Sequence, residues 1–399
     1  MLRRRGHRVA FILEESFAGT LEAQGFEERV MRLGPPPEQE EAPGQFWKDF
    51  IRDTAPVFRK PTIEQLEGFI APTMQVLVDG ARYVDDRLHE IIDELRPEVI
   101  VEDNVCAFPA LPASGVPWVR IVSCNPAEIR DPAVPPAFSG YPTTDQTDWA
   151  GYLEEFRRTH EAMHREFDEF CRGRGARGLP ELEFMYESPF ANLYLFPQEV
   201  DYARSQPLGR WTNLEANVRS TDAPWTLPDF DNDGPLVYLS LGSLGSADTA
   251  LMQSLIDTLS GAPVRVVVSM GPQHDALRLG ANMTGAEFLP QASILPLVDL
   301  VITHGGNNTV TESLYFGKPM VVLPLFWDQY DNAQRLHETG FGRRLDTYGH
   351  EPEELLRAID ELRTDRALRA RLDAVSRRLQ ATPGTSVAAD ALERVIAPR

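Results

Sequence analysis

The chain has 399 residues, which is long for a single hydrophobic core and sufficient for two α/β domains. Hydrophobic residues make up 42% and charged residues 25%, a composition that excludes the disordered and fibrous classes. The formal net charge of −21 disfavours nucleic acids and anionic lipid surfaces as partners, because both are negatively charged. We therefore expect a globular protein that binds neither.

The cysteines and the N-terminus give no sign of export. Three cysteines without a regular spacing fit neither a disulfide framework nor a zinc site, so a reducing compartment is expected. Glu14 and Glu15 interrupt the apolar stretch after the basic start, which disfavours a signal peptide. No apolar run reaches the ~18 residues of a membrane helix. We expect a cytoplasmic chain without a membrane span.

Strand and helix signals alternate through the first half, which is typical of an α/β domain with a parallel sheet. Apolar residues recur at helical spacing over 74–95, and Pro97 ends that helix. A second long helix is predicted over 149–171. The predicted strands cover 8–13, 99–101, 118–122 and 192–196. Two Pro-rich stretches, 35–70 and 126–142, show no regular pattern.

Residues 220–234 are turn-forming and acidic, and we place a linker there, between an N-terminal domain over 1–219 and a C-terminal domain over 235–399. The linker aspartates imitate a calcium loop, but Ser240 stands where that loop needs a glutamate. We interpret the segment as a solvated linker. After it, strands are predicted over 236–241, 264–269, 287–289, 299–303 and 320–323, and helices over 249–259, 308–316, 353–372 and 386–396.

The segment 299–312 carries the strongest chemical signal. A buried strand runs into a two-glycine turn and a helix begins at once, so unpaired backbone N–H groups and the positive end of the helix dipole meet at one point. A diphosphate is a natural ligand there, because the glycines allow the backbone to approach closely. The residues that would contact it are His304, Gly305, Gly306, Asn308 and Thr309.

Glu312 has a second interpretation. The segment from Thr309 to Glu312 matches a capping box, in which the glutamate fastens the start of the helix. Glycine turns between a strand and a helix are also frequent, so this turn alone leaves a phosphate site and an ordinary turn equally open.

Two other loops place polar groups at strand ends. Asp328 and Gln329 follow the strand 320–323, at the edge where parallel sheets bind ligands. A carboxylate beside a carboxamide suits sugar hydroxyls. Ser243 follows the strand 236–241 and can present its hydroxyl to the same phosphates. An ordinary polar loop is the alternative in both places.

These segments resemble the donor-binding signature of the UDP-glycosyltransferases of the GT-B fold, glycosyltransferase family 1, and most of all its bacterial branch that glycosylates macrolides and other natural products. The segments that carry the resemblance are 239–243, Pro290-Gln291, 304–312 and 324–329. A weaker similarity extends over the whole chain. The resemblance implies two facing Rossmann-like domains with parallel sheets, a cleft between them, and a last helix that crosses back to the N-terminal domain.

The resemblance also implies roles. Phe288 and Gln291 would bracket the uracil and the ribose, and Glu312 would hold the ribose hydroxyls. The diphosphate would contact Ser243, His304, Asn308 and Thr309, and the transferred sugar would contact Asp328 and Gln329. Asn307 stands where the plant members have tryptophan, and Phe288 replaces the tryptophan that is usual at its position. We therefore expect base stacking that is either weaker or differently built. The family needs no metal and no cofactor besides the sugar donor.

One departure concerns catalysis. Family members carry a Gly-His loop well before the Gly-His-Arg-Val element, and its histidine deprotonates the acceptor. Here Met1 stands only five residues before Gly6, so we expect an N-terminally truncated sequence that lacks the first strand and the base, with poor solubility as a consequence. Asp103 follows a strand where the family places the carboxylate that orients the base, and it is equally open to being a turn residue. His7 is interpreted as structural.

The function that follows is inverting transfer of a hexose from a UDP-sugar, or another NDP-sugar, to a hydroxyl of a small apolar natural product. Two alternatives stay open: a donor-binding protein without catalysis, and a sugar-nucleotide epimerase. An aromatic stripe on the helix 149–171 suits either core packing, which we favour, or the wall of an acceptor pocket. Its residues are Tyr152, Phe156, Met163, Phe167 and Phe170.

Overall fold

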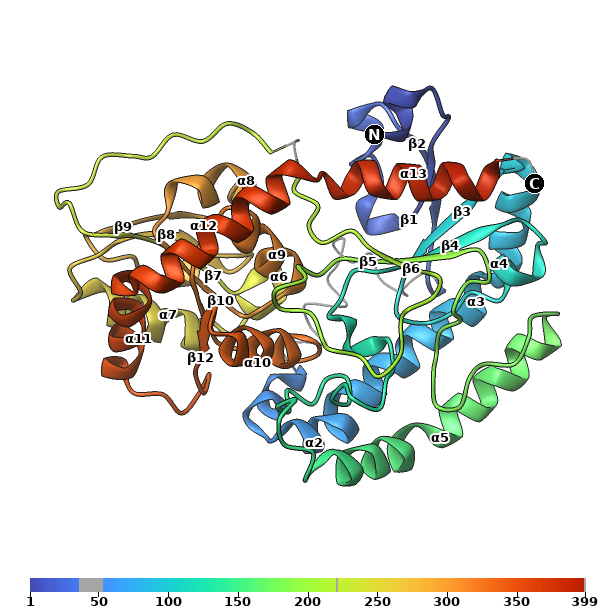
Figure 1. Ribbon diagram of the computed structural model, residues 1–399, viewed down its shortest axis with the longest axis horizontal. Helices are drawn as coiled ribbons and strands as arrows, with labels where there is room; N and C mark the ends of the chain where they lie inside the picture. The colour runs from blue at the N-terminus through green and yellow to red at the C-terminus, as the bar shows by residue number, and fades with distance from the viewer. Residues whose placement is uncertain (36–52, 220–221, 398–399) are drawn as a thin grey trace.

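The computed structural model describes residues 1–35, 53–219 and 222–397. These residues form two α/β domains that lie side by side (Figure 1). The chain passes between the domains through the extended segment before β7, and again at its C-terminal end, where the last helix lies over the N-terminal domain (Figure 1).

The described part of the N-terminal domain contains two parallel sheets that are not hydrogen-bonded to each other. One sheet pairs β1 (Ala10–Glu14) with β2 (Glu27–Met31). The other has the order β3-β4-β5-β6, with bounds Ile100–Asp103, Trp118–Val122, Ala191–Tyr194 and Trp211–Asn213. The helices of this domain are α2 (Thr62–Gln65), α3 (Ala71–Leu95), α4 (Ala110–Ala113) and α5 (Trp149–Gly173), and the short turn η6 covers Pro126–Glu128.

The long helix α3 forms because its apolar residues recur on one face. Val78, Val84 and Ile91 on that face are buried, whereas Asp79 and Asp86 on the opposite face are exposed. Gly80 lies on the buried side, where an added Cβ would come within 3.1 Å of the carbonyl oxygen of Leu33. The helix also packs against α5, so both long helices cover the same side of the domain (Figure 1).

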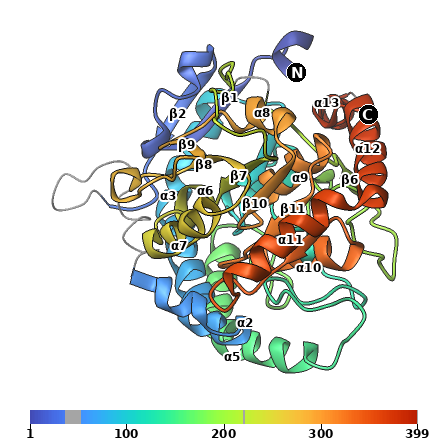
Figure 2. The ribbon, with the colours of Figure 1, turned by 90° about the vertical axis from the view of Figure 1, so that its left-hand side faces the viewer.

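The C-terminal domain is built on a six-stranded parallel sheet, within the described residues, of order β12-β11-β10-β7-β8-β9. All residues of β7 and β10 are buried, as expected for central strands of a sheet covered by helices on both faces. The strands cover Leu236–Ser240 (β7), Arg265–Ser269 (β8), Met283–Ala286 (β9), Leu300–Thr303 (β10), Met320–Val322 (β11) and Gly342–Arg344 (β12). The helices cover Gly242–Gly245 (α6), Thr249–Ser260 (α7), Gln291–Ile294 (α8), Asn307–Tyr315 (α9), Gln329–Thr339 (α10), Pro352–Thr364 (α11) and Arg366–Ala381 (α12). Figure 2 shows several of these helices in front of the strands.

The last helix, α13 (Gly384–Ile396), lies on the N-terminal domain. Leu392 packs into a cluster with Val119 and Leu193 of that domain's sheet. His7 contacts Glu393 at 3.0 Å, a partner on this helix and away from the edge where the strands end. The helix begins at a glycine because an added Cβ on Gly384 would lie 2.3 Å from the carbonyl oxygen of Leu214.

Several predicted elements need correction. The strand predicted over 287–289 is wrong, because β9 pairs with β8 over Met283–Ala286, where Gly285 lets the strands approach. The single helix predicted over 353–372 is two helices, since Asp365 caps the second one by accepting a hydrogen bond from the Leu368 N–H. Strands β2, β6 and β12 were not predicted. β2 and β12 are sheet edges rich in charged residues, so they lack an apolar pattern.

A buried histidine in α5 makes the fold sensitive to acid. His160 is fully buried and stacks on Phe156 with ring centroids 4.0 Å apart. Burial lowers the pKa of His160 to about 4. Below pH 6.5 an unfolded chain therefore takes up a proton at this position that the folded chain does not, and stability falls until the pH reaches the folded pKa.

We expect His160→Leu to reduce the loss of stability between pH 7 and pH 5 by roughly 2 kcal/mol relative to the unmodified chain. Urea unfolding of both proteins at the two pH values measures this difference. Equal losses in the two proteins would show that the buried imidazole takes up its proton as readily in the folded chain as in the unfolded one.

Candidate functional site

The turn after β10 depends on its two glycines. Gly305 has a φ of +89°, and a Cβ there would lie 2.8 Å from Val322 Cγ1 and 3.1 Å from the carbonyl oxygen of Gln329. Its N–H donates to Thr303 Oγ1 at 3.2 Å. A left-handed residue in such close contact with β11 and α10 has to be glycine. The turn therefore brings the start of α9 beside the start of α10.

His304 lies between glycines on two different loops. Added Cβ atoms on Gly242 and Gly306 would lie 2.8 Å from its Cε1 and 2.6 Å from its Nε2. The ring is hydrogen-bonded to the backbone carbonyl of Ser240, yet burial dominates and lowers the pKa of His304 to about 4. The imidazole is therefore neutral at physiological pH, and it acts as a hydrogen-bonding group and not as a positive charge.

The helix α9 begins at Asn307, and its N-cap residue Gly306 makes no side-chain capping bond. The backbone N–H groups of the first turn are thus left without a side-chain cap. Asn308 is exposed at this end, while Thr309 is buried. The capping-box interpretation of Glu312 is wrong, because the helix starts before Thr309 and the glutamate lies inside it.

Glu312 instead forms a polar cluster with α8. Gln291 Nε2 donates to Glu312 Oε2 at 2.6 Å and lies 3.3 Å from Thr309 Oγ1. Arg219 lies 3.8 Å from the other carboxylate oxygen. Burial raises the pKa of Glu312, and the Gln291 hydrogen bond and Arg219 oppose this. Phe288, three residues before Gln291, has 63% of its surface exposed and is available as a flat contact.

The start of α10 faces the N-terminal domain. Asp328 Oδ2 accepts a hydrogen bond from the Asn125 N–H at 2.9 Å, and burial raises the pKa of this carboxyl to about 6. Gln329 Oε1 accepts from the N–H groups of Leu325 and Phe326, which closes the loop before the helix. Ser243 is exposed on α6, beyond the end of β7.

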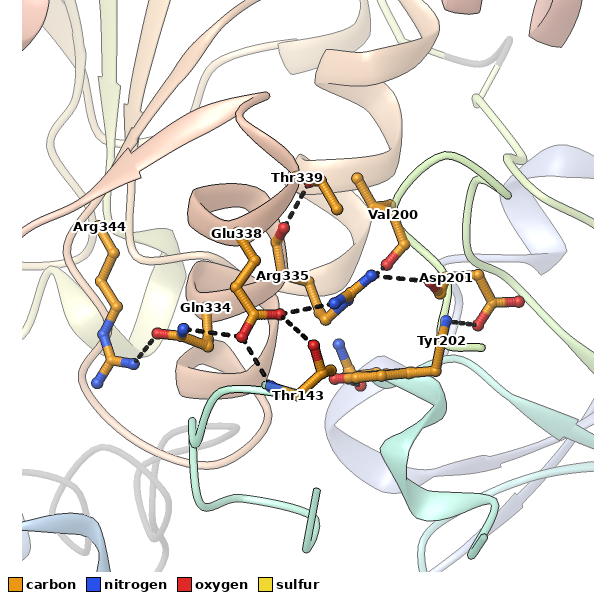
Figure 3. A network of polar contacts seen from close by, with 10 residues as sticks. Thr143, Val200, Asp201, Tyr202, Gln334, Arg335, Glu338, Thr339 and Arg344 are labelled. Carbon is orange, nitrogen blue, oxygen red and sulfur yellow. Dashed lines mark hydrogen bonds and ion pairs between the residues drawn. The ribbon is translucent and has the colours of Figure 1, made fainter. Parts of the chain in front are cut away.

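Asn307 points to the other domain. Its Nδ2 donates to the carbonyl oxygens of Ser123 at 2.8 Å and Leu195 at 3.0 Å. Further along α10, Arg335 donates to the Val200 and Asp201 carbonyl oxygens, both at 2.9 Å. Figure 3 shows this second set of contacts, in which Glu338 also accepts the Thr143 N–H. The polar residues at the starts of α9 and α10 thus lie at the junction of the two domains.

A cavity of about 430 Å³ opens beside this junction. Most of its wall is apolar, and the N-terminal domain supplies nearly all of it. Trp327 reaches it from the C-terminal domain and packs on Phe138 with ring centroids 4.6 Å apart. Other wall residues are Met74, Val134, Trp149, Tyr152, Phe156, Phe184 and Met185.

The aromatic stripe on α5 packs in the core, and its first part also borders the cavity. Tyr152, Met163 and Phe167 are buried in the core, as preferred from the sequence. Tyr152 and the half-buried Phe156, near the start of the helix, also line the cavity. Periodicity cannot separate the two roles, because both require an apolar helix face.

A second cavity, of about 230 Å³, lies at the ends of β3 and β4. Asp103 lines it, and its Oδ1 accepts a hydrogen bond from Ser123 Oγ at 2.7 Å. Nearby protein atoms desolvate the carboxyl and raise its pKa. Glu128, in η6, lines both cavities.

Comparison with known proteins identifies this arrangement. Residues 225–382 match the family model of UDP-glucuronosyl and UDP-glucosyl transferases. The whole chain is 25% identical to demethyllactenocin mycarosyltransferase from Streptomyces fradiae, over 100% of this chain and 82% of that one. The chain is a glycosyltransferase of the GT-B fold. Its C-terminal domain carries the match to the UDP-glucuronosyl and UDP-glucosyl transferases, and a bacterial mycarosyltransferase is among its homologues.

Solved structures give the same fold for this glycosyltransferase. The glycotransferase of kitacinnamycin aligns with a TM-score of 0.71 at 24% identity, over 99% of this chain and 92% of that one. Spinosyn rhamnosyltransferase SpnG, solved in complex with thymidine diphosphate, aligns with a TM-score of 0.63 at 20% identity, over 98% of this chain and 94% of that one. In the part of the glycosyltransferase that the structure describes, no helix is both long and apolar enough to cross a membrane.

Sequence reasoning did not single out the residues that join the C-terminal domain of this glycosyltransferase to the cavity. It named neither Asn125 nor Glu128, and it included Trp327 only as part of the segment 324–329. The stretch 126–142 has no regular pattern, so it indicated only a loop. Its position after the strand 118–122 was the available signal, because ligands bind at the carboxyl ends of parallel strands.

Proposed function

We propose that this glycosyltransferase moves a hexose from a UDP-sugar, or another NDP-sugar, to a hydroxyl of a small apolar natural product, with inversion at the anomeric carbon. The observation that carries the proposal is the position of the apolar cavity. The cavity lies beside the polar starts of α9 and α10. Trp327 belongs to the cavity wall, and the next residue, Asp328, is the N-cap of α10.

In this proposal the nucleotide lies along α8 and α9. Glu312 holds the ribose hydroxyls, since a carboxylate accepts two hydrogen bonds and Gln291 keeps it in place. Phe288 covers the base with its exposed ring. Gln291 supports the ribose contact. These roles fit the polar cluster on α9, and a thymine base suits the same surface as uracil.

The diphosphate then lies at the start of α9. Its contacts would be the N–H groups of the turn and the side chains of Ser243, His304, Asn308 and Thr309. Because His304 is neutral, stabilisation of the leaving diphosphate comes from hydrogen bonds and the helix dipole. Gly305 and Gly306 keep the turn open for the phosphates, and Asn307 joins it to the N-terminal domain. The proposal needs no metal ion and no further cofactor.

The sugar lies at Asp328 and Gln329. A carboxylate and a carboxamide at one helix start discriminate hydroxyl positions by accepting and donating hydrogen bonds. The acceptor fills the 430 Å³ cavity, a size typical of sites for small organic ligands. Its hydroxyl would attack the anomeric carbon in line with the departing diphosphate, so a single displacement inverts the configuration. Asp103 is our candidate for the carboxylate that orients the group which takes up the hydroxyl proton.

The apolar cavity also separates this proposal from the alternatives. A sugar-nucleotide epimerase or a donor-binding protein without catalysis has no use for a wall of aromatic and aliphatic side chains next to the sugar.

The decisive experiment incubates the chain with UDP-glucose or TDP-glucose and a panel of apolar alcohols, with and without EDTA. Glycoside formation that EDTA does not reduce supports the proposal. Donor hydrolysis or epimerisation without glycoside would contradict it.

Glu312→Ala tests the nucleotide position. We expect the Kd for UDP to rise by at least about tenfold, because two charge-assisted hydrogen bonds to the ribose are lost. Isothermal titration calorimetry measures this directly. The control is Glu353→Ala, which removes an exposed glutamate from α11. Equal affinities for all three proteins would place the nucleotide elsewhere.

A further inference from the structure

The loop after β4 is held from both sides of the domain junction. The carbonyl oxygen of Ser123 accepts the Asn307 amide at 2.8 Å, and the Asn125 N–H donates to Asp328 at 2.9 Å. The Asn125 side chain also bonds to Asn332 of α10 at 2.8 Å. Glu128 ends the short turn η6, which starts directly after Asn125. Its backbone is therefore fixed relative to the proposed sugar contact Asp328.

Glu128 lies where the two cavities meet. It lines both the 430 Å³ apolar cavity and the 230 Å³ cavity at the strand ends. Its side chain keeps 11% of its surface exposed, so the carboxyl is nearly but not fully enclosed. An acceptor seated in the apolar cavity would therefore border Glu128.

The carboxyl of Glu128 is only loosely satisfied. Its one ion pair is long, with 3.6 Å between Glu128 Oε2 and a terminal nitrogen of Arg120. The Cys124 thiol, a weak donor, is hydrogen-bonded to the carboxyl, and Oε1 has no hydrogen-bond partner among the described residues. The charged and titratable groups that face it are Arg120 on β4, Cys124 on its own loop, Asp103 on β3 and Asp328 of the other domain. Burial and the Asp328 charge raise the pKa of Glu128 to about 7, against the opposing effect of Arg120. A carboxyl with such a pKa exchanges protons readily at neutral pH.

Asp103 is less well placed for direct contact with an acceptor. Asp103 lines the small cavity but not the apolar one, and one of its carboxylate oxygens already accepts a hydrogen bond from the Ser123 hydroxyl at 2.7 Å. Glu102, its neighbour, is buried and pairs in register with Arg120, but lines neither of these two cavities. Of these three carboxylates, Glu128 alone borders the apolar cavity.

We propose that Glu128 is a catalytic residue that removes the proton from the acceptor hydroxyl, an inference that rests on the proposed function. The acceptor oxygen forms a bond to the anomeric carbon, and the bond from that carbon to the diphosphate oxygen breaks. The bonding pair leaves with the diphosphate. The hydroxyl proton passes to the Glu128 carboxylate and then to water, so the enzyme returns to its starting state.

The test compares Glu128→Gln with the matched variant Glu102→Gln in the full chain. Both variants remove a buried carboxylate next to Arg120. The acceptors are benzyl alcohol, which needs a base, and para-nitrophenol, which is already ionised in slightly alkaline buffer. We expect Glu128→Gln to lower kcat for benzyl alcohol by about 10²–10⁴-fold and to lower it far less for para-nitrophenol. Glu102→Gln is expected to leave both rates within a few-fold of the original.

Three results would overturn the proposal: equal losses on the two acceptors, no loss on either, or a loss for Asp103→Asn alone. The Kd for UDP, measured on each variant, shows whether the donor site is intact.

If Glu128→Gln does not fold, Glu128→Ala with added formate replaces it. Rescue of the benzyl alcohol rate by formate supports the proposal, and a folded variant without rescue contradicts it. Absence of transfer by the unmodified chain, despite UDP binding, would instead refute the proposed function.

Discussion

Gly305→Ala is expected to abolish tight donor binding and to lower stability by about 2–5 kcal/mol. A left-handed backbone costs an alanine about 1–2 kcal/mol. Steric overlap adds roughly 1–3 kcal/mol, because the new Cβ would lie 2.8 Å from Val322 Cγ1 and 3.1 Å from the Gln329 carbonyl oxygen. Relief of this overlap moves the Gln329 backbone, and with it the proposed sugar contacts at the start of α10.

Differential scanning calorimetry and UDP titration check this prediction together. The matched control is Gly151→Ala, at a glycine of α5 where an added Cβ meets no atom within 4 Å. Alanine favours a helix over glycine by about 0.5–1 kcal/mol, so the control is expected to be slightly stabilised with unchanged UDP affinity. A Gly305→Ala protein that binds UDP normally would mean that the turn accommodates the methyl group and that its shape does not determine the donor site.

The shape of the proposed donor site was predictable because its central residues follow one another closely in the sequence. The turn 304–306 stands directly between a buried strand and a helix, and local patterns indicate both. Parallel pairing of β10 with β7 and β11 then brings the loops after these strands together, which explains why Ser243 and Asp328 could be assigned to the same edge. Glu312 shows the limit of local patterns. Its capping motif is present in the sequence, but the helix begins earlier than the motif requires.

The acceptor side was not predictable in the same way. Its cavity combines wall residues from α3, the loop after β4, α5, the loop before β5 and the loop before α10. Apart from Trp327, which lies in the segment 324–329, the wall residues belong to no recognisable motif. An aromatic residue in a cavity wall also has the same pattern as one in the core. The helix α10 was also missed, because its exposed and interdomain faces are both polar and leave only a narrow apolar stripe.

The polar side of α10 explains how the domains keep their relative position. Asp331 Oδ2 and Oδ1 accept the N–H groups of Phe138 and Gly140 at 2.6 and 2.8 Å. One helix therefore carries the proposed sugar contacts at its start and holds a loop of the acceptor cavity along its first turn. A shift of this helix changes both sites at once.

Arg335→Ala is therefore expected to lower kcat/KM for glycosyl transfer by at least about tenfold and stability by roughly 3 kcal/mol. Arg335 lies over Tyr202, bonds to two carbonyl oxygens of the N-terminal domain, and pairs with Glu338 at 2.7 Å (Figure 3). Its removal leaves both carbonyl groups without this donor in a nearly buried place, and Glu338 loses its charged partner while it keeps its hydrogen bonds from Thr143. The loss in kcat/KM follows because α10 is no longer fixed against the acceptor domain.

The matched control is Arg343→Ala, which removes an arginine whose pair with Glu361 is half-exposed, at 48% for each side chain. Exposed pairs contribute less than about 1 kcal/mol, so both stability and kcat/KM are expected to stay near their original values. Thermal unfolding and initial rates with a saturating sugar donor give the two readouts. If Arg335→Ala lowers stability but leaves kcat/KM unchanged, the contacts of α10 hold the domains together without positioning the sugar contacts at its start. The two roles of this helix would then be energetically separate, although the residues concerned lie within about two turns of one another.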